Sequence, residues 1–132
     1  MTDDTSAGIS RPRPVALVAD DEPVIGATLV EILQEEGFDA IAVSDGESAL
    51  FWAQLARPDF VITDVVMPKL NGIELAKRLQ LLLPKTRLIV FSGQAGSPEL
   101  LQKARAEGLV CEVLAKPIKP QELLARMGVA RG

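Results

Sequence analysis

The chain has 132 residues, a net charge of −4, 48% hydrophobic residues, one cysteine and no histidine. This length and composition suit one domain with one hydrophobic core, and the negative charge disfavours nucleic acid or an anionic membrane as the partner. Cys111 alone cannot form an intramolecular disulfide bond, and we expect it to be a small core residue. The lack of histidine excludes His-dependent triads and histidine metal sites, so any chemistry rests on carboxylate, hydroxyl and lysine groups.

The chain begins with a polar segment, residues 1–13, that we expect to be a disordered lead. It has no apolar stretch typical of a signal peptide, and no run in the chain approaches the roughly 18 apolar residues that cross a bilayer. We therefore expect a cytoplasmic protein. We place one folded domain at residues 14–128 and a C-terminal tail at 129–132, and we expect a stand-alone domain that signals through its own surface.

Five short apolar runs alternate with five amphipathic stretches along this domain. The runs, each predicted to be a β-strand, are Val15–Ala19, Phe38–Val43, Phe60–Thr63, Leu88–Phe91 and Val113–Ala115. The stretches have helical spacing of apolar residues. The second helix is predicted to open with the capping box Ser44-Asp-Gly-Glu47, and the third to run from Gly72 to Leu83, before Pro84.

Strict alternation of strand and helix predicts an α/β fold. We expect a doubly wound, five-stranded parallel sheet with helices on both faces and the flavodoxin-like strand order 2-1-3-4-5. In such a sheet, ligands bind outside the carboxyl ends of the strands, at the point between strands 1 and 3 where the strand order reverses.

Carboxylate side chains stand at the ends of these two strands. Asp20 and Asp21 follow the first, and Asp64 follows the third. Such a cluster repels itself unless protons or a cation neutralise it, and Mg²⁺ prefers oxygen ligands. Ser92 and Lys116 follow strands 4 and 5 at the same edge. Because an Asp carboxylate can form an acyl phosphate, and a lysine can neutralise a phosphate oxygen, this set predicts an aspartate that accepts a phosphoryl group.

Four segments in this order resemble the receiver domain of bacterial two-component response regulators, over about residues 14–128. They are Val18-Ala-Asp-Asp-Glu-Pro23, Asp64-Val-Val-Met-Pro-Lys-Leu-Asn-Gly72, Phe91-Ser92 and Leu114-Ala-Lys-Pro117. The resemblance implies that Asp64 is the phosphoacceptor. It also implies that Asp21, Asp64 and the backbone carbonyl of Val66 ligate Mg²⁺, and that Asp20 assists through water.

The resemblance assigns the remaining site residues as well. It implies that Ser92 is the switch hydroxyl, that Lys116 is the site lysine, and that the Lys116–Pro117 peptide bond is cis. Val66 and Gln94, each two residues past a site residue, would flank the water that attacks the acyl phosphate. Valine cannot orient this water by a side-chain hydrogen bond.

The implied function is a Mg²⁺-dependent phosphorylation switch without a separate turnover substrate. A sensor histidine kinase or a histidine phosphotransfer protein would supply the phosphoryl group. A monomer or weak homodimer would then bind a downstream protein, with no nucleic acid or membrane involved. Two alternatives stay open. One is an Asp-nucleophile phosphohydrolase, although Val66 stands where such enzymes usually carry a second acid; the other is a receiver-like scaffold that is not phosphorylated.

The chain departs from the family near its C-terminus. Val113 stands three residues before Lys116, where receivers usually carry Tyr or Phe, and the chain has no tyrosine. The segment from Gly108 to Lys116 is one residue longer than usual, and the fifth helix is short and contains Gly128. All three changes fall on the face formed by helix 4, strand 5 and helix 5, so we expect this face to work unusually or another face to signal.

Several of these residues also have a purely structural interpretation. Asp20 and Asp21 are candidate caps for the helix that begins near Pro23. Asp64 is a candidate turn residue, Ser92 a candidate loop residue and Lys116 a candidate solvated charge.

Two aromatic residues fall in the second helix. We expect Phe51 and Trp52 to pack that helix, with a partner surface as the alternative.

Overall fold

The computed structural model describes residues 13–93 and 97–129, so most of the lead expected at 1–13 and most of the tail expected at 129–132 lie outside the described residues. Strands and helices alternate along the described chain. The strands are β1 (Val15–Ala19), β2 (Asp39–Val43), β3 (Phe60–Asp64), β4 (Arg87–Ser92) and β5 (Glu112–Ala115). The helices are α1 (Pro23–Glu35), α2 (Gly46–Ala56), α3 (Gly72–Leu82), α4 (Ser97–Ala106) and α5 (Pro120–Arg126).

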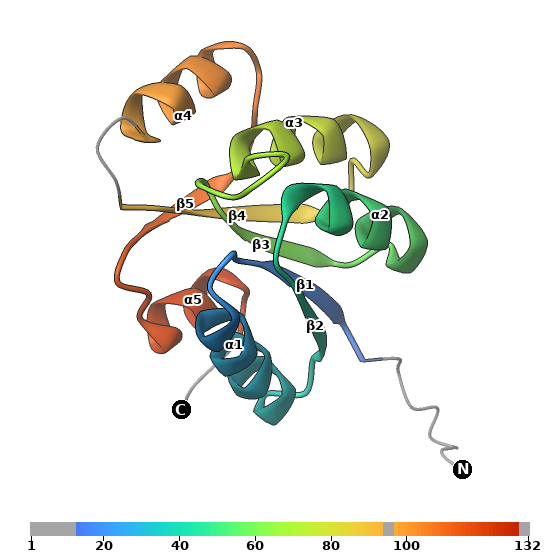
Figure 1. Cartoon of the computed structure of the whole chain (residues 1–132). Coiled ribbons are helices and arrows are strands. Elements are labelled where there is room, and N and C mark those ends of the chain that lie inside the picture. The colour runs from blue at the N-terminus through green and yellow to red at the C-terminus, as the bar shows by residue number, and fades with distance from the viewer. Residues whose placement is uncertain (1–12, 94–96, 130–132) are drawn as a thin grey trace.

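The strands form one parallel sheet in the order β2-β1-β3-β4-β5. Helices α1 and α5 cover one face of the sheet, and α2, α3 and α4 cover the other (Figure 1). This arrangement confirms the doubly wound fold predicted from the alternation of strand and helix. It also places β1 and β3 side by side in the middle of the sheet, with their carboxyl ends at the same edge.

The strands are apolar along their length because side chains alternate between two covered faces. In β1, Leu17 packs into the core under α2, α3 and α4, whereas Ala16 and Val18 pack into the core beside α1 and α5. In β3, Val61 and Ile62 divide in the same way. Each large apolar side chain buried in these cores contributes roughly 1.5–3 kcal/mol of transfer free energy.

Two helices begin at side-chain caps. The Asp45 carboxylate accepts a hydrogen bond from the Ser48 N–H at 2.7 Å, and the Asn71 side-chain oxygen accepts one from the Glu74 N–H at 2.9 Å. The predicted capping box that starts at Ser44 is therefore wrong by one residue, because Asp45 is the N-cap of α2. Aspartate is among the preferred residues at this position, since it satisfies a free N–H of the first helical turn.

The expectation that Phe51 and Trp52 pack α2 is wrong. Their side chains are 60% and 42% exposed. Helix α2 instead buries its small residues, among them Ala49 and Ala53, against the rest of the molecule. Because a helix that lies on its small residues approaches the sheet closely, its large apolar side chains are left on the outer side.

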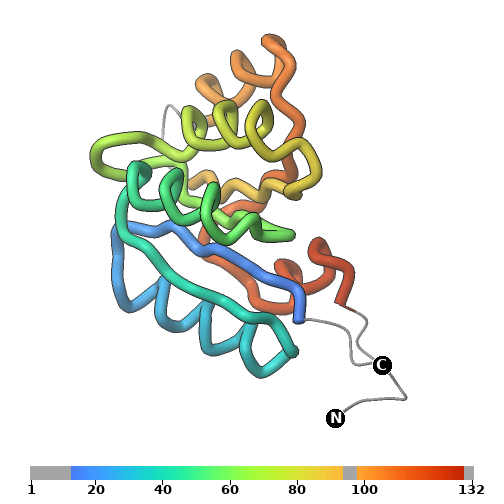
Figure 2. The backbone as a smooth tube through the Cα atoms, turned by 90° about the vertical axis from the view of Figure 1, so that its right-hand side faces the viewer, coloured from blue at the N-terminus to red at the C-terminus, as the bar shows by residue number. Residues whose placement is uncertain are grey.

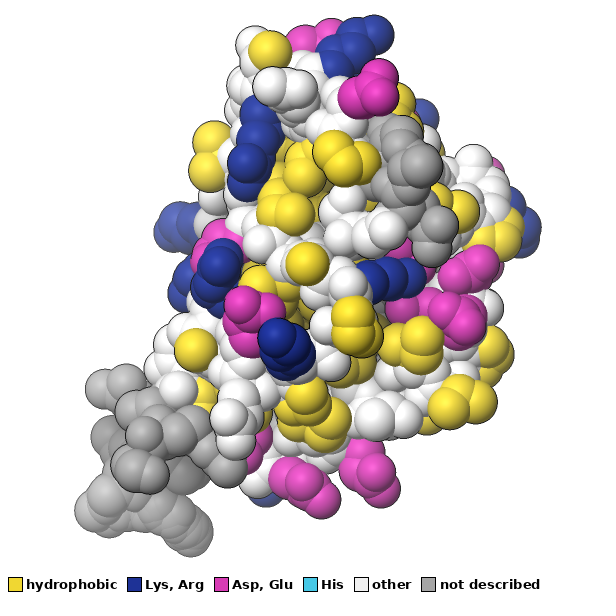
Figure 3. All heavy atoms as spheres, turned by 90° about the vertical axis from the view of Figure 1, so that its left-hand side faces the viewer, with side chains coloured by type: hydrophobic (Ala, Val, Ile, Leu, Met, Phe, Trp, Pro, Cys, Tyr) yellow, Lys and Arg dark blue, Asp and Glu magenta, His cyan; other side chains and the backbone are white. Residues whose placement is uncertain are grey.

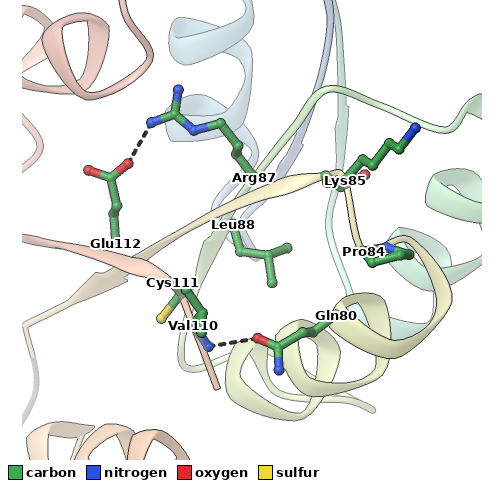
Figure 4. A pocket seen from close by; sticks show the side chains of 9 residues that line it. Gln80, Pro84, Lys85, Arg87, Leu88, Val110, Cys111 and Glu112 are labelled. Carbon is green, nitrogen blue, oxygen red and sulfur yellow. Dashed lines mark hydrogen bonds and ion pairs between the residues drawn. The ribbon is translucent and has the colours of Figure 1, made fainter. Parts of the chain in front are cut away.

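The connection between α4 and β5 is held at the edge of the sheet opposite the strand ends described above (Figure 4). The Gln80 side chain accepts a hydrogen bond from the Val110 N–H at 2.6 Å and donates one to the Gly108 carbonyl at 2.9 Å. Nearby, Arg87 pairs with Glu112 at 2.8 Å. The long segment after Gly108 is thus anchored to α3, far from the carboxylates.

Helix α3 begins against the end of β3. The Gly72 N–H donates to the Val65 carbonyl at 2.8 Å, and a Cβ atom at position 72 would lie 1.9 Å from the Asp64 carbonyl oxygen. A glycine is required here because no side chain fits between the helix and the strand end.

We predict that Gly72→Ala lowers the free energy of unfolding by about 3 kcal/mol or more, because the backbone at Asp64 must shift to admit the methyl group. Urea unfolding measures the change. Gly26→Ala is the matched control, since a Cβ at position 26 first meets the Ala42 Cβ at 3.4 Å. In a helix interior this change should stabilise by about 0.5–1 kcal/mol. Equal effects at the two sites would contradict the close approach at Gly72.

Candidate functional site

Three carboxylates meet where β1 and β3 end. Asp20, Asp21 and Asp64 each offer one carboxylate oxygen, and these oxygens lie within 4.8 Å of one another. The parallel register pairs Ala19 with Thr63, so the residues that follow them come to the same edge of the sheet. The cluster stands at the reversal of strand order, where the sequence predicted it.

Asp20 is almost completely buried, with 2% of its surface exposed. Its Oδ1 accepts a hydrogen bond from the Glu22 N–H at 2.8 Å, but its buried Oδ2 has no partner among the described residues. Burial is the largest cause of a raised pKa for the Asp20 carboxyl; the Glu22 N–H opposes this, and the charges of Asp64 and Asp21 add to it. The site thus holds a carboxylate oxygen that is unsatisfied without a proton or a cation.

Lys116 supplies the positive charge at this edge. Its Nζ donates to Asp64 Oδ2 at 2.6 Å, so the interpretation of Lys116 as a solvated charge is wrong. Burial lowers the pKa of Lys116, but the hydrogen bond and charge of Asp64, with the charges of Asp20 and Glu22, outweigh burial and raise that pKa overall. The lysine is therefore a fixed cation at neutral pH.

Neither Asp20 nor Asp21 is the N-cap of helix α1, so their interpretation as helix caps is wrong. Glu22 is the N-cap of α1 and makes no side-chain capping hydrogen bond. Asp20 accepts its hydrogen bond from the N–H of this N-cap residue, one position before the helix. Asp21 is exposed at the rim of the site.

Two hydrogen bonds between side chains and the backbone hold the strand end at Asp64. The buried Thr63 hydroxyl donates to the Asp64 carbonyl at 2.9 Å, and the Val66 N–H donates to Asp64 Oδ1 at 3.4 Å. Thr63 is not among the site residues predicted from the sequence. A hydroxyl residue within an otherwise apolar run, next to the key acid, is the signal that would have found it.

Ser92 ends β4 beside the other site residues. It pairs with Ala115 across the sheet, and its carbonyl accepts the Lys116 N–H at 3.3 Å. The Lys116–Pro117 peptide bond is cis. The structure thus brings Ser92 and Lys116 to the edge that carries the acids, whereas Gln94 lies outside the described residues.

The donor set fits a hard divalent cation. The three carboxylates lie beside Lys116, whose single positive charge leaves the cluster with an excess of negative charge. One of their oxygens, the buried Asp20 Oδ2, has no hydrogen-bond partner among the described residues. Mg²⁺ is bound in proteins by one or two carboxylates and retains positions for water and phosphate oxygens. No histidine or cysteine competes for the site, since the described cluster consists of aspartates alone.

A hollow of about 530 Å³ lies beside the site, between α4 and β5. Its lining includes Ser92, Leu101, Arg105, Val113 and Ala115. Figure 3 shows this side of the molecule, where hydrophobic side chains gather among charged ones. The small Val113 side chain leaves this space open at the position where the family usually carries an aromatic ring.

The doubly wound fold with an acidic cluster at its strand ends defines a receiver-type architecture. Residues 16–128 match the family model of the response regulator receiver domain, and the chain belongs to this family. It is 37% identical to the alkaline phosphatase synthesis transcriptional regulatory protein PhoP of Bacillus subtilis, over 84% of this chain and 45% of PhoP. It is 35% identical to the transcriptional regulatory protein PdtaR of Mycobacterium tuberculosis, over 96% of this chain and 60% of PdtaR.

Solved structures show the same fold. The chemotaxis protein CheY4 of Vibrio cholerae is 31% identical, covers 90% of this chain and all of its own, and superimposes with a TM-score of 0.78. The chain is thus a receiver domain of the two-component systems, and receiver domains are signalling switches. In the part that the structure describes, no helix has the length and apolar character needed to span a membrane.

The expectation that nucleic acid is excluded as a partner conflicts with the relatives. MtrA of Mycolicibacterium smegmatis, 32% identical over 84% of this chain and 47% of MtrA, is a DNA-binding response regulator. The chain spans about half the length of the curated relatives it matches. The net charge of one domain is therefore a poor guide to the partners of whole regulators.

We predict that Asp20→Asn raises the free energy of unfolding of the metal-free protein by about 1–2 kcal/mol, because it removes one of three mutually repelling charges. Urea unfolding in the presence of a chelator measures the change. Asp39→Asn, at an exposed position of β2, is the control and should change stability by less than about 0.5 kcal/mol. A loss of stability in Asp20→Asn would show that favourable contacts hold this carboxylate.

We further predict that Val113→Phe raises the free energy of unfolding by about 1 kcal/mol, because the hollow admits the ring and buries it. Thermal unfolding measures the change. Val90 is the matched control, since it pairs with Val113 across β4 and β5 but is completely buried. Val90→Phe should overpack the core and cost about 1–3 kcal/mol. Similar losses in both variants would argue against usable space beside Val113.

Proposed function

We propose that this receiver domain is a Mg²⁺-dependent phosphorylation switch that accepts a phosphoryl group on Asp64. The observation that carries the proposal is the Asp64 carboxylate itself, which is 6% exposed, hydrogen-bonded to Lys116 and clustered with two further carboxylates. Such a cluster costs stability, so its presence is explained by chemistry at the site.

Asp20, Asp21, Asp64 and the backbone carbonyl of Val66 would hold the magnesium ion. When bound, Mg²⁺ neutralises carboxylate charge and the charge of a phosphate oxygen. This assignment accounts for the buried Asp20 Oδ2 that lacks a hydrogen-bond partner among the described residues.

The protein's own side chains perform the transfer. An Asp64 carboxylate oxygen forms the new bond to phosphorus, while the bond between phosphorus and the donor's imidazole nitrogen breaks and the nitrogen keeps the electron pair. The products are an acyl phosphate on Asp64 and a free histidine on the donor. Lys116 then moves its hydrogen bond from the Asp64 carboxylate to a phosphoryl oxygen, and the Ser92 hydroxyl binds another.

These 132 residues contain no histidine, so a histidine that donates the phosphoryl group would lie outside them. We assign this role to a sensor histidine kinase or a histidine phosphotransfer protein, and we place the reaction in the cytoplasm. The domain, residues 14–128, would pass the signal on by binding a downstream partner. It would have no separate turnover substrate, and water would hydrolyse the acyl phosphate.

The Val66 side chain shapes this last step. It is 54% exposed beside Asp64. Because it offers no hydrogen-bonding group, it can shield the acyl phosphate but cannot orient the attacking water, and it cannot act as the second acid of an Asp-nucleophile phosphohydrolase.

We predict that incubation with acetyl phosphate and Mg²⁺ adds the mass of one phosphoryl group to the intact protein. Asp64→Asn should abolish the addition because the nucleophile is lost, and chelation of Mg²⁺ should reduce it strongly. Intact-protein mass spectrometry makes the measurement. Asp39→Asn serves as the control and should be phosphorylated like the unmodified sequence.

A phosphorylated Asp64→Asn variant would contradict the assignment of the acceptor. A lack of phosphorylation of the unmodified sequence, with both acetyl phosphate and a phosphorylated histidine donor, would identify a receiver-like scaffold.

A further inference from the structure

The Thr63 hydroxyl is a polar group in an otherwise apolar interior. Thr63 is completely buried near the end of β3, and Val61 and Ile62 precede it in the same strand. Valine has the same shape as threonine and would fill this position without a polar atom. Because a buried hydroxyl costs free energy unless it makes a hydrogen bond, its partners indicate what it does.

Both partners of this hydroxyl belong to Asp64 and the loop that follows it. The Thr63 Oγ1 donates to the Asp64 carbonyl at 2.9 Å and lies 3.8 Å from the Met67 sulfur. A hydroxyl has one proton to donate, and a thioether sulfur is a weak acceptor, so the carbonyl is the main partner. Since side chains alternate along a strand, Thr63 lies with Val61 on the face that α2, α3 and α4 cover, and the Asp64 side chain leaves the strand on the opposite face.

The first residue of α3 covers the hydrogen bond between Thr63 and Asp64. A Cβ atom at position 72 would lie 1.9 Å from the Asp64 carbonyl oxygen and 3.0 Å from the Thr63 Oγ1. A place that does not admit a methyl group does not admit a water molecule either. On this side, the Asp64 carbonyl therefore depends on Thr63 for its hydrogen bond.

The hydroxyl acts on the loop of residues 65–71, which joins β3 to α3 and passes beside the first turn of α2 (Figure 2). Because a peptide group is planar, a bond to the Asp64 carbonyl also sets the direction of the Val65 N–H. This N–H donates to the Phe91 carbonyl at 3.2 Å. The next peptide group is held by the Val65 carbonyl, which accepts the Gly72 N–H at 2.8 Å.

These two peptide groups direct the Asp64 carboxylate. The Val66 N–H belongs to the second of them and donates to Asp64 Oδ1 at 3.4 Å, while the Lys116 Nζ donates to Asp64 Oδ2 at 2.6 Å. Each carboxylate oxygen thus has its own donor. The Val66 carbonyl, which we place among the magnesium ligands, belongs to the next peptide group along the chain.

We propose that Thr63 is a positioning residue for the chemistry at Asp64. Its hydroxyl holds the peptide group between Asp64 and Val65, and through this group it holds the Asp64 carboxylate and the Val66 carbonyl. The role depends on the proposed function, because such positioning matters where Asp64 binds Mg²⁺ and accepts a phosphoryl group. Since Thr63 is buried on the other face of the sheet, it acts through the backbone and not by contact with the metal or the phosphoryl group.

Two variants that differ by one hydroxyl test this role. Residues that hold metal ligands in place typically change metal affinity about 10–100-fold when they are replaced. We expect Thr63→Ala to weaken Mg²⁺ binding about tenfold, and to slow phosphorylation by acetyl phosphate at saturating Mg²⁺ by about threefold or more. Thr63→Ser lacks the same methyl group but keeps the hydroxyl, so both quantities should stay within about twofold of the unmodified sequence. NMR titration with MgCl₂ measures the affinity, and intact-protein mass spectrometry measures the rate.

Thr86→Ala is the matched control. It removes a hydroxyl that donates to the Pro58 carbonyl at 2.7 Å, just before β4 begins and therefore at the opposite edge of the sheet. This variant should bind Mg²⁺ and be phosphorylated like the unmodified sequence. Thermal unfolding of each variant verifies that it is folded, and Thr63→Val, which fills the space of the lost methyl group, replaces Thr63→Ala if the latter does not fold.

Loss of affinity and rate in Thr63→Ala, with recovery in Thr63→Ser, establishes the positioning role. Unchanged values in Thr63→Ala would overturn it, as would equal impairment in Thr63→Ser or in Thr86→Ala. The unmodified sequence separates this role from the proposed function. If it neither binds Mg²⁺ nor is phosphorylated, the proposed function fails and the positioning role fails with it; if it does both and the Thr63 variants behave like it, the positioning role alone is wrong.

Discussion

The mutual repulsion of Asp20, Asp21 and Asp64 is the constraint on which the site depends. At separations within 4.8 Å, ionised carboxylates destabilise one another, and water screens only part of this repulsion because Asp20 and Asp64 are buried. Lys116 offsets part of this cost through its 2.6 Å contact with Asp64. One lysine cannot balance three acids, so the folded protein carries an electrostatic deficit that a bound cation removes. The strand order, which places β1 beside β3 and brings the β5 lysine to the same edge, is what creates both the deficit and its partial compensation.

The loop that follows Asp64 is fixed by close backbone approaches on both sides. Helix α3 begins at Gly72, where a Cβ atom would collide with the Asp64 carbonyl, and helix α2 begins at Gly46, where a Cβ atom would lie 1.8 Å from the Leu70 carbonyl. The Gly46 N–H also donates to the Pro68 carbonyl at 3.4 Å. The loop that follows Asp64 therefore lies in close contact with the first turns of two helices.

Much of this arrangement could be predicted from the sequence, because strand ends and chain topology are encoded locally. Apolar runs that end in Asp20 or Asp64 mark the carboxyl ends of strands, and the alternation of elements brings those ends together. The exposure of Phe51 and Trp52 could not be predicted in the same way. Hydrophobicity identifies residues that favour burial, but the face that α2 buries is decided by how closely its small residues approach the sheet, which is a tertiary property. Thr63 was missed because its hydroxyl acts on the backbone and carries no charge of its own.

The same packing links the site to the surface of α2. A valine at position 113 leaves a hollow next to Ser92, so no large side chain at this position connects the strand end to α4. At Gly46, in contrast, the backbone of α2 touches the loop that follows Asp64 with no room to spare. A displacement of that loop on phosphorylation would have to move the start of α2 or break the contact. Closely packed interiors transmit strain. A shift of the loop after Asp64 would therefore reach α2 and its exposed aromatic residues more directly than the face of α4, β5 and α5 that the family usually employs.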